Sequence, residues 1–333
     1  MIYIIAEAGV NHNGSLEKAF ELIKQAKLAG ADCIKFQTFK SENLVSKDSP
    51  KAHYQMETTD KKESQYEMLK KLEISYDDFK LIKNECSVKQ IDFISTPYSF
   101  EDIDFLDSLG IEYYKIASGQ LTEKPFIEYI ASKKRQIILS TGMSSLADVI
   151  LAVDIIRKYK IEPIVLQCNT NYPSNISDAN LKAMLTMKNE MNVSVGYSDH
   201  VKNNYASYAA AALGAVVIEK HFTLDKNNTG PDHSSSCNPS EFSELVIGIR
   251  NIELSLGNGI KKPSKSELKN APLMKRSMVL KNDMKKGDII SIKDIDFKRP
   301  SNGLPPNSLE LILGKKITDN YKKNTLVNLQ MIK

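Results

Sequence analysis

Two histidines, each at the end of a short apolar run, are the residues of this sequence whose spacing most directly indicates chemistry. His200 follows Gly-Tyr-Ser-Asp, and His221 follows Val-Ile-Glu-Lys. Side chains alternate between the two faces of a strand, so Ser198 shares a face with His200, and Glu219 shares one with His221. Two imidazoles at the ends of successive strands can bind one metal ion and leave positions for water and substrate. We therefore expect a metal or acid–base site, although either histidine alone could be an ordinary core or loop residue.

The elements that must position these histidines alternate between short apolar runs and longer amphipathic stretches. Ser15 is expected to cap the first helix, and the last helix is expected to begin after the cap Asn238, with Pro239 first, and to stop at Gly257. The expected strands span residues 3–8, 33–37, 91–96, 113–116, 137–140, 164–167, 193–196 and 215–220. Eight strands alternating with helices predict a parallel (β/α)8 TIM barrel. An open doubly wound sheet is the alternative, but no glycine-rich fingerprint follows the first strand.

The length of 333 residues suits one large domain and a small one. We place the catalytic barrel at residues 1–260 and a small β-rich domain at residues 273–333, where short apolar runs alternate with turn residues. Residues 261–272 are polar and show little helical apolar periodicity, so they are expected to form a linker.

The net charge of +4 is unevenly distributed along the chain. Residues 259–333 carry 17 Lys and Arg against 7 Asp and Glu, a net charge of about +10, and the rest carries 28 against 34, about −6. The lysines of the basic part are scattered and are not interleaved with aromatic residues, so no nucleic-acid partner is expected. A solvated surface, or a face that docks on an acidic domain and anionic substrates, explains the charge better.

Neither the N-terminus nor the cysteines indicate export. The first apolar run is too short for a signal peptide and lacks a basic start, and no segment approaches membrane-spanning length. The four cysteines, Cys33, Cys86, Cys168 and Cys237, are widely spaced without a CxxC pair, so neither a zinc knuckle nor a disulfide framework is expected. A reduced, cytoplasmic setting without a membrane partner is the expectation.

Polar residues gather where the predicted strands end, and functional residues of a (β/α)8 barrel lie at that end. Two inward lysines with several hydroxyls around one pore could hold a small dianion, because lysine supplies charge and hydroxyls supply directional donors. Lys35 alone could be a surface lysine, and the turn after Ser140 could be only a helix cap, but the ring as a whole predicts a site. Its members are Glu7, Lys35, Gln37, Thr96, Lys115, Ser118, Gln120, Ser140, Thr170, Tyr172, Ser198, His200, Glu219 and His221.

Stretches from one end of the chain to the other resemble the bacterial sialic acid synthases, which condense phosphoenolpyruvate with an N-acylated hexosamine. The matching stretches are IAEAGVNHNG (5–14), IKFQT (34–38), STP (95–97), YKIASG (114–119), LSTGM (139–143), SDH (198–200), IEKHFT (218–223), GPD (230–232) and KRP (298–300). The resemblance implies a (β/α)8 barrel followed by a small domain similar to type III antifreeze proteins, an SAF domain. It also implies a domain-swapped homodimer.

The resemblance further implies roles for individual residues. His200 and His221 correspond to the ligands of a divalent metal, usually manganese, with Mg²⁺ and Co²⁺ as alternatives. The phosphoenolpyruvate cradle corresponds to Lys35, Thr96, Lys115, Ser118, Ser140 and Ser198. The sugar side corresponds to Glu7, Gln37, Tyr172, Asp232 and, reaching from the other subunit, Arg299. Glu219 stands beside the metal as a candidate for moving protons.

Three positions depart from the family pattern, and each leaves a role open. Gln120 stands where many members have Glu, so an acid–base role there is in doubt. Thr170 stands where some members have Asn, and Leu273 stands where an aromatic residue can occur.

The resemblance predicts a metal-dependent synthase that condenses phosphoenolpyruvate with open-chain N-acetylmannosamine and water, with C–O cleavage, to give N-acetylneuraminate and phosphate. The alternative is N,N'-diacetyllegionaminate, made from 2,4-diacetamido-2,4,6-trideoxymannose. A metal-dependent hydrolase on the same barrel is more remote, since such sites often carry His-x-His on the first strand, where this chain has Glu7. A non-catalytic binding module would require a decayed ring, and the ring is intact.

Overall fold

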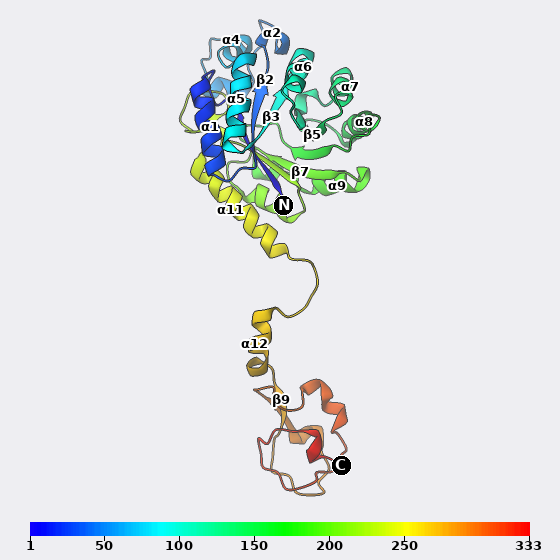
Figure 1. Cartoon of the computed structure of the whole chain (residues 1–333). Coiled ribbons are helices and arrows are strands. Elements are labelled where there is room, and N and C mark those ends of the chain that lie inside the picture. The colour runs from blue at the N-terminus through cyan, green and yellow to red at the C-terminus, as the bar shows by residue number, and fades with distance from the viewer. The chain divides into compact units, whose positions relative to one another are not determined.

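The computed structural model describes residues 1–333, which divide into two compact units, Met1–Gly257 and Asn258–Lys333 (Figure 1). The first unit contains eight parallel strands in the order β3-β2-β1-β8-β7-β6-β5-β4. Their bounds are β1 Tyr3–Gly9, β2 Cys33–Thr38, β3 Asp92–Pro97, β4 Tyr113–Ile116, β5 Gln136–Ser140, β6 Ile164–Cys168, β7 Ser194–Asp199 and β8 Val217–His221. Because β1 bonds to both β2 and β8, the sheet curls into a nearly closed barrel. The predicted TIM barrel is confirmed, and the doubly wound sheet is excluded.

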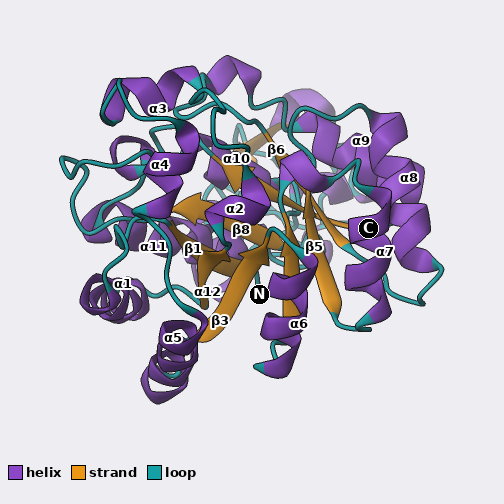
Figure 2. Cartoon of the chain, turned by 90° about the horizontal axis from the view of Figure 1, so that it is seen from above, coloured by secondary structure: helices purple, strands orange, loops and turns teal.

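Helices surround the strands, as the view from above shows (Figure 2). Each lies in the chain between strands or after the last one: α1 Leu16–Leu28, α2 Ser41–Leu44, α3 His53–Thr58, α4 Gln65–Lys70, α5 Tyr76–Lys89, α6 Phe100–Ser108, α7 Lys124–Ser132, α8 Leu146–Arg157, α9 Lys182–Met191, α10 Tyr205–Ala212 and α11 Pro239–Leu256. The predicted caps are present. Ser15 accepts a hydrogen bond from the Lys18 amide, and Asn238 forms a capping box with Glu241.

The alternation of side chains along each strand divides the barrel into an outer core and an inner site. Outward residues such as Ile34 and Phe36 of β2 pack in the main core. Inward residues at the amino-terminal end form a separate apolar floor of Ile5, Cys33, Ile94, Ile138, Leu166 and Val217. Two residues further along, the same strands present polar side chains, so the register that buries the floor also positions the site.

The second unit has its own small core around an antiparallel pair, β9 Ser277–Leu280 and β10 Ile295–Lys298. Helix α12, Lys265–Met274, occupies most of the segment that was expected to be a linker. None of the helix is buried, so it needs no apolar stripe. A capping box between Ser264 and Glu267 marks its start instead.

Two further expectations concern cysteines and membranes. All four cysteines are buried and unpaired. None of the helices combines the length and apolar character needed to cross a bilayer.

Candidate active site

A cavity of about 340 Å³ opens at the carboxyl ends of the barrel strands. All predicted site residues except Asp232 and Arg299 line it. Lys35 and Gln37 come from β2, Ser198 from β7, and Glu219 and His221 from β8. Because every second side chain of a strand points into the barrel, residues from distant parts of the chain meet in this cavity, as was predicted for the strand-end residues. Their individual roles remain predictions.

One side of the cavity is cationic and rich in hydroxyls. Lys35 Nζ donates to Thr96 Oγ1 at 3.0 Å, and Lys115 Nζ donates to Ser140 Oγ at 2.6 Å. Both lysine side chains are almost completely buried, at 4% and 3% exposed. Two buried ammonium groups with hydroxyl partners form a site that can compensate a doubly charged anion.

The turn after β5 places the backbone of Gly142 close to Ser118, on the lysine side of the cavity. The Gly142 amide donates to Ser118 Oγ at 2.9 Å. A Cβ at position 142 would collide with Thr170 Oγ1 and stand 2.9 Å from Ser118 Oγ. Glycine is therefore required here for close approach, and the turn after Ser140 does more than cap a helix.

Two buried carboxylates lie beside the lysines, and their surroundings push their pKa values apart. Glu7 Oε2 is 2.8 Å from Lys35 Nζ, and Glu219 Oε1 is 3.8 Å from both Lys35 Nζ and Lys115 Nζ. Burial raises the pKa of Glu7 to about 7, although Lys35 lowers it. Burial also opposes ionisation of Glu219, but Lys115 and Lys35 outweigh burial and hold its pKa below the usual range. Near neutral pH, Glu7 can therefore donate or accept a proton, while Glu219 stays ionised.

The opposite side of the cavity contains the two histidines and an aromatic ring. The ring centroids of His200 and His221 are 5.2 Å apart, and Tyr172 lies 4.1 Å from the former and 5.4 Å from the latter. His200 Nδ1 bonds to the carbonyl of Asn169, which leaves its other ring nitrogen free. Burial holds the pKa of His221 well below its usual value, so this imidazole is neutral and can act as a ligand.

Several buried polar atoms of the cavity lining have no hydrogen-bond partner. They are Gln120 Oε1, Thr170 Oγ1, Glu219 Oε2 and His221 Nδ1. A buried polar atom without a partner costs about 1–3 kcal/mol, so these atoms fit a site that is completed by a polar ligand.

The histidine pair is compatible with a divalent metal but does not enclose one. No group of three His, Cys, Asp or Glu side chains lies close enough together to hold a metal ion. His221 Nδ1 is buried without a hydrogen-bond partner, and the Asp232 carboxylate is 3.8 Å from it. A metal bound here would have two imidazole ligands and would take its remaining ligands from substrate and water.

The last two predicted residues lie elsewhere. Asp232 lines an adjoining cavity of about 230 Å³ that also includes Gln37, Tyr172 and His221. Burial raises the pKa of Asp232 to about 6. Arg299 is an exposed residue of the second unit and follows β10.

The structure also contains site-forming residues that the sequence analysis did not predict. Tyr54 and Tyr98 line the cavity, and Tyr54 lies 5.1 Å from Tyr172 between ring centroids. On the outer face of β7 and β8, buried Lys220 pairs with Asp199 at 2.7 Å. Both belong to the quoted motifs, and the alternation of faces places them behind the histidines, so their positions could have been deduced.

Comparisons with known proteins agree with this geometry. The NeuB family matches residues 22–261, and the SAF domain matches residues 275–333. The chain is 46% identical to the N,N'-diacetyllegionaminic acid synthase of Campylobacter jejuni serotype O:2 over 97% of this chain and 98% of that protein. It is 44% identical to the N,N'-diacetyllegionaminic acid synthase of Legionella pneumophila over 97% and 92%.

Among solved structures, the N-acetylneuraminic acid synthetase of Leptospira borgpetersenii superposes with a TM-score of 0.72 at 35% identity. The superposition covers 81% of this chain and 90% of that structure.

Proposed function

Since this chain belongs to the NeuB family, whose members condense phosphoenolpyruvate with a sugar, we propose that it makes N,N'-diacetyllegionaminate. The substrates would be phosphoenolpyruvate, open-chain 2,4-diacetamido-2,4,6-trideoxymannose and water, with phosphate as the second product. The observation that carries the proposal is one cavity with two buried lysines on one side and two histidines on the other.

The cationic side suits phosphoenolpyruvate. Lys35 and Lys115 would compensate its phosphate and carboxylate charges, and the hydroxyls of Thr96, Ser118 and Ser140 would orient it. Ser198 donates to Glu219 Oε1 at 3.1 Å and completes this wall. Held in this way, the methylene carbon of phosphoenolpyruvate faces an aldehyde bound on the histidine side.

The two carboxylates would move the protons. The methylene carbon forms the new C–C bond to the aldehyde carbon, and the aldehyde oxygen takes a proton to become a hydroxyl. Glu7, with its pKa of about 7, is suited to donate that proton. Water then adds to the former enol carbon and loses a proton, for which the ionised Glu219 is the acceptor. Phosphate then leaves by cleavage of its C–O bond, while the added hydroxyl becomes the keto oxygen and its proton passes to the departing phosphate.

A divalent metal, manganese first, is part of the proposal. When bound by His200 and His221, it would act as a Lewis acid that polarises the aldehyde oxygen. The unpartnered His221 Nδ1 and the neutral state of that ring support this assignment. A two-imidazole site suits manganese better than zinc, which prefers more protein ligands.

The relatives support the choice of sugar. The resemblance by itself led to N-acetylneuraminate as the first prediction. The two diacetyllegionaminic acid synthases are 46% and 44% identical over nearly the whole chain, against 35% for the N-acetylneuraminic acid synthetase structure. These identities support the diacetamido sugar better. The hydrolase alternative finds no support among these relatives.

We also propose the domain-swapped homodimer, in which Arg299 of one subunit completes the sugar site of the other. No arginine lines the cavity of the first unit, and a guanidinium would add a fork of donors for an acylamino oxygen.

The decisive experiment offers phosphoenolpyruvate with each of the two sugars in turn and compares kcat/KM. We expect phosphate release with the diacetamido sugar at least tenfold above that with N-acetylmannosamine. A preference for N-acetylmannosamine would refute the choice of sugar. Absence of phosphate release with both sugars, in metal-loaded protein, would refute the synthase itself.

A further inference from the structure

A second chamber opens from the active-site cavity on its histidine side. It is the 230 Å³ cavity that contains Asp232, and it shares several lining residues with the main cavity. The shared residues are Gln37, Leu44, Tyr54, Tyr98, Tyr172 and His221. The two cavities therefore adjoin at the Tyr54–Tyr172 ring pair, and a ligand that occupies both would pass this pair.

The walls of the chamber differ in chemistry from one side to the other. Its apolar wall comes from Val10, Leu44, Val45, Met68 and Leu69, which pack in one small cluster apart from the main core. Its polar wall contains the Asp232 carboxylate and the amides of Gln37, Gln55 and Gln65. Such a chamber suits a ligand end that has both hydroxyl and methyl groups.

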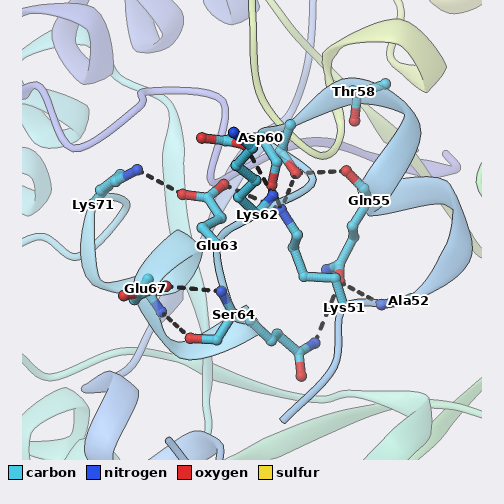
Figure 3. Close-up of polar contacts among 12 residues, drawn as sticks. Lys51, Ala52, Gln55, Thr58, Asp60, Lys62, Glu63, Ser64, Glu67 and Lys71 are labelled. Carbon is cyan, nitrogen blue, oxygen red and sulfur yellow. Dashed lines mark hydrogen bonds and ion pairs between the residues drawn. The ribbon is translucent and has the colours of Figure 1, made fainter. Parts of the chain in front are cut away.

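Apart from Val10, the apolar wall lies on the segment between β2 and α5, and a buried lysine bonds to several parts of this segment. Lys51, whose side chain is 2% exposed, donates to Thr59 Oγ1 at 2.8 Å and to the Asp60 carbonyl, and pairs with Glu63 at 3.2 Å. Figure 3 shows these contacts, with Lys71 on the far side of Glu63 at 2.6 Å.

This network joins the two short helices that face the chamber. Thr59 ends α3, which carries Tyr54, and Glu63 precedes α4, which carries Met68 and Leu69. None of the contacts involves a residue of the proposed chemistry. The network thus supports the chamber and contacts none of the lysines, carboxylates or histidines of the proposed chemistry.

We propose that this chamber binds the end of the sugar remote from the aldehyde and selects a 6-deoxy sugar by placing its methyl group on the apolar wall. This inference rests on the proposed function. Asp232 and Gln37 would accept and donate hydrogen bonds at the sugar hydroxyls. A sugar with a hydroxyl group at C6 would place that hydroxyl against the apolar side chains of Leu44 and Val45, which disfavours it.

The test makes the apolar wall polar and measures both sugars. The variants are Leu44→Asn and the nearly isosteric Val45→Thr, and both positions are half-buried. The control is Leu254→Asn, the same exchange at a residue of α11 that is 82% exposed. Melting temperatures verify folding, and Val45→Thr carries the test if Leu44→Asn does not fold.

We expect each wall variant to lower kcat/KM for 2,4-diacetamido-2,4,6-trideoxymannose by roughly tenfold, since loss of one apolar contact in a pocket changes specificity by about 10–200-fold. The value for N-acetylmannosamine should change by less than about twofold, and the KM for phosphoenolpyruvate should stay as in the wild type. Equal losses for both sugars, or no loss for either, would overturn the chamber assignment while the synthase stands. A wild type that releases no phosphate with either sugar would remove both proposals.

Discussion

The two inward lysines face the same cavity but have different partners, so their replacement by methionine should separate substrate binding from stability. Lys35 lies 2.8 Å from Glu7 and 3.8 Å from Glu219, and these carboxylates outweigh burial and raise its pKa. Lys115 has Ser140 as its close partner, and its contact with Glu219 is 3.8 Å. Burial lowers the pKa of Lys115, so its charge is less well compensated in the absence of a ligand.

These partners determine how much unfolding free energy and how much affinity for phosphoenolpyruvate each variant should lose. Lys35→Met leaves the buried Glu7 carboxylate without its cation, and breaking a buried pair in this way costs about 3–5 kcal/mol of unfolding free energy. Lys115→Met removes a charge whose burial is unfavourable but also takes one of two cations from buried Glu219, so we expect it to cost less than Lys35→Met, about 1–3 kcal/mol. Each variant loses a charge-assisted contact with phosphoenolpyruvate of about 1.5–3 kcal/mol, equal to about a 10- to 150-fold rise in its KM.

Urea denaturation followed by circular dichroism gives the stability, and initial rates at varied phosphoenolpyruvate and sugar give the two KM values. Lys24→Met is the control, because Lys24 is 52% exposed on α1 and pairs only with Glu21. Equal stability losses for Lys35→Met and Lys115→Met would refute the reasoning about their partners. Equal rises in KM for phosphoenolpyruvate and sugar would refute the anion site.

Three other predictions test the remaining parts of the site. Chelation should abolish turnover and Mn²⁺ should restore it better than Zn²⁺; full activity in metal-free protein would contradict the histidine site. A proton donor must be protonated, so kcat/KM should fall as pH rises through about 7, the pKa of Glu7. In Glu7→Gln this fall of the pH–rate profile should be absent; if it were unchanged, Glu7 would not be the donor. Arg299→Ala and Lys35→Ala should each be nearly inactive, but subunit exchange should recover activity in heterodimers; verified exchange without recovery would exclude a role in trans.

The barrel and most of its ring could be predicted because a single periodicity encodes both. Ile5 and Glu7 stand two residues apart on β1, as Val217 and Glu219 do on β8. The first member of each pair joins the apolar floor, and the second reaches the cavity. A strand recognised from its apolar run therefore also indicates which polar residue points inward. The seventh strand ends at Asp199, three residues beyond the predicted end. The prediction stopped too early because the last residues of this strand are polar and do not continue the apolar run.

The chamber could not be predicted in the same way. The segment between β2 and α5 forms helices of four to six residues, which are too short to show a helical apolar stripe. Its fold depends on one buried lysine, Lys51, with partners 8 to 12 residues away in the sequence. Lysine is rarely buried unless it is paired, so composition alone gives no reason to place it inside.

The pair formed by Asp199 and Lys220 explains why the histidines keep their places. Asp199 lies opposite Lys220 across β7 and β8, and Ser198 lies opposite Glu219 in the same register. Lys220 Nζ also donates to the carbonyls of Val201 and Asn203, in the turn that follows His200. A slip of one residue would turn this ammonium into the cavity and the Glu219 carboxylate into the apolar core. A buried ion pair adds little stability over apolar packing, but it penalises every register except the one that pairs it. The outward pair thus favours the register in which Glu219 and His221 face the cavity.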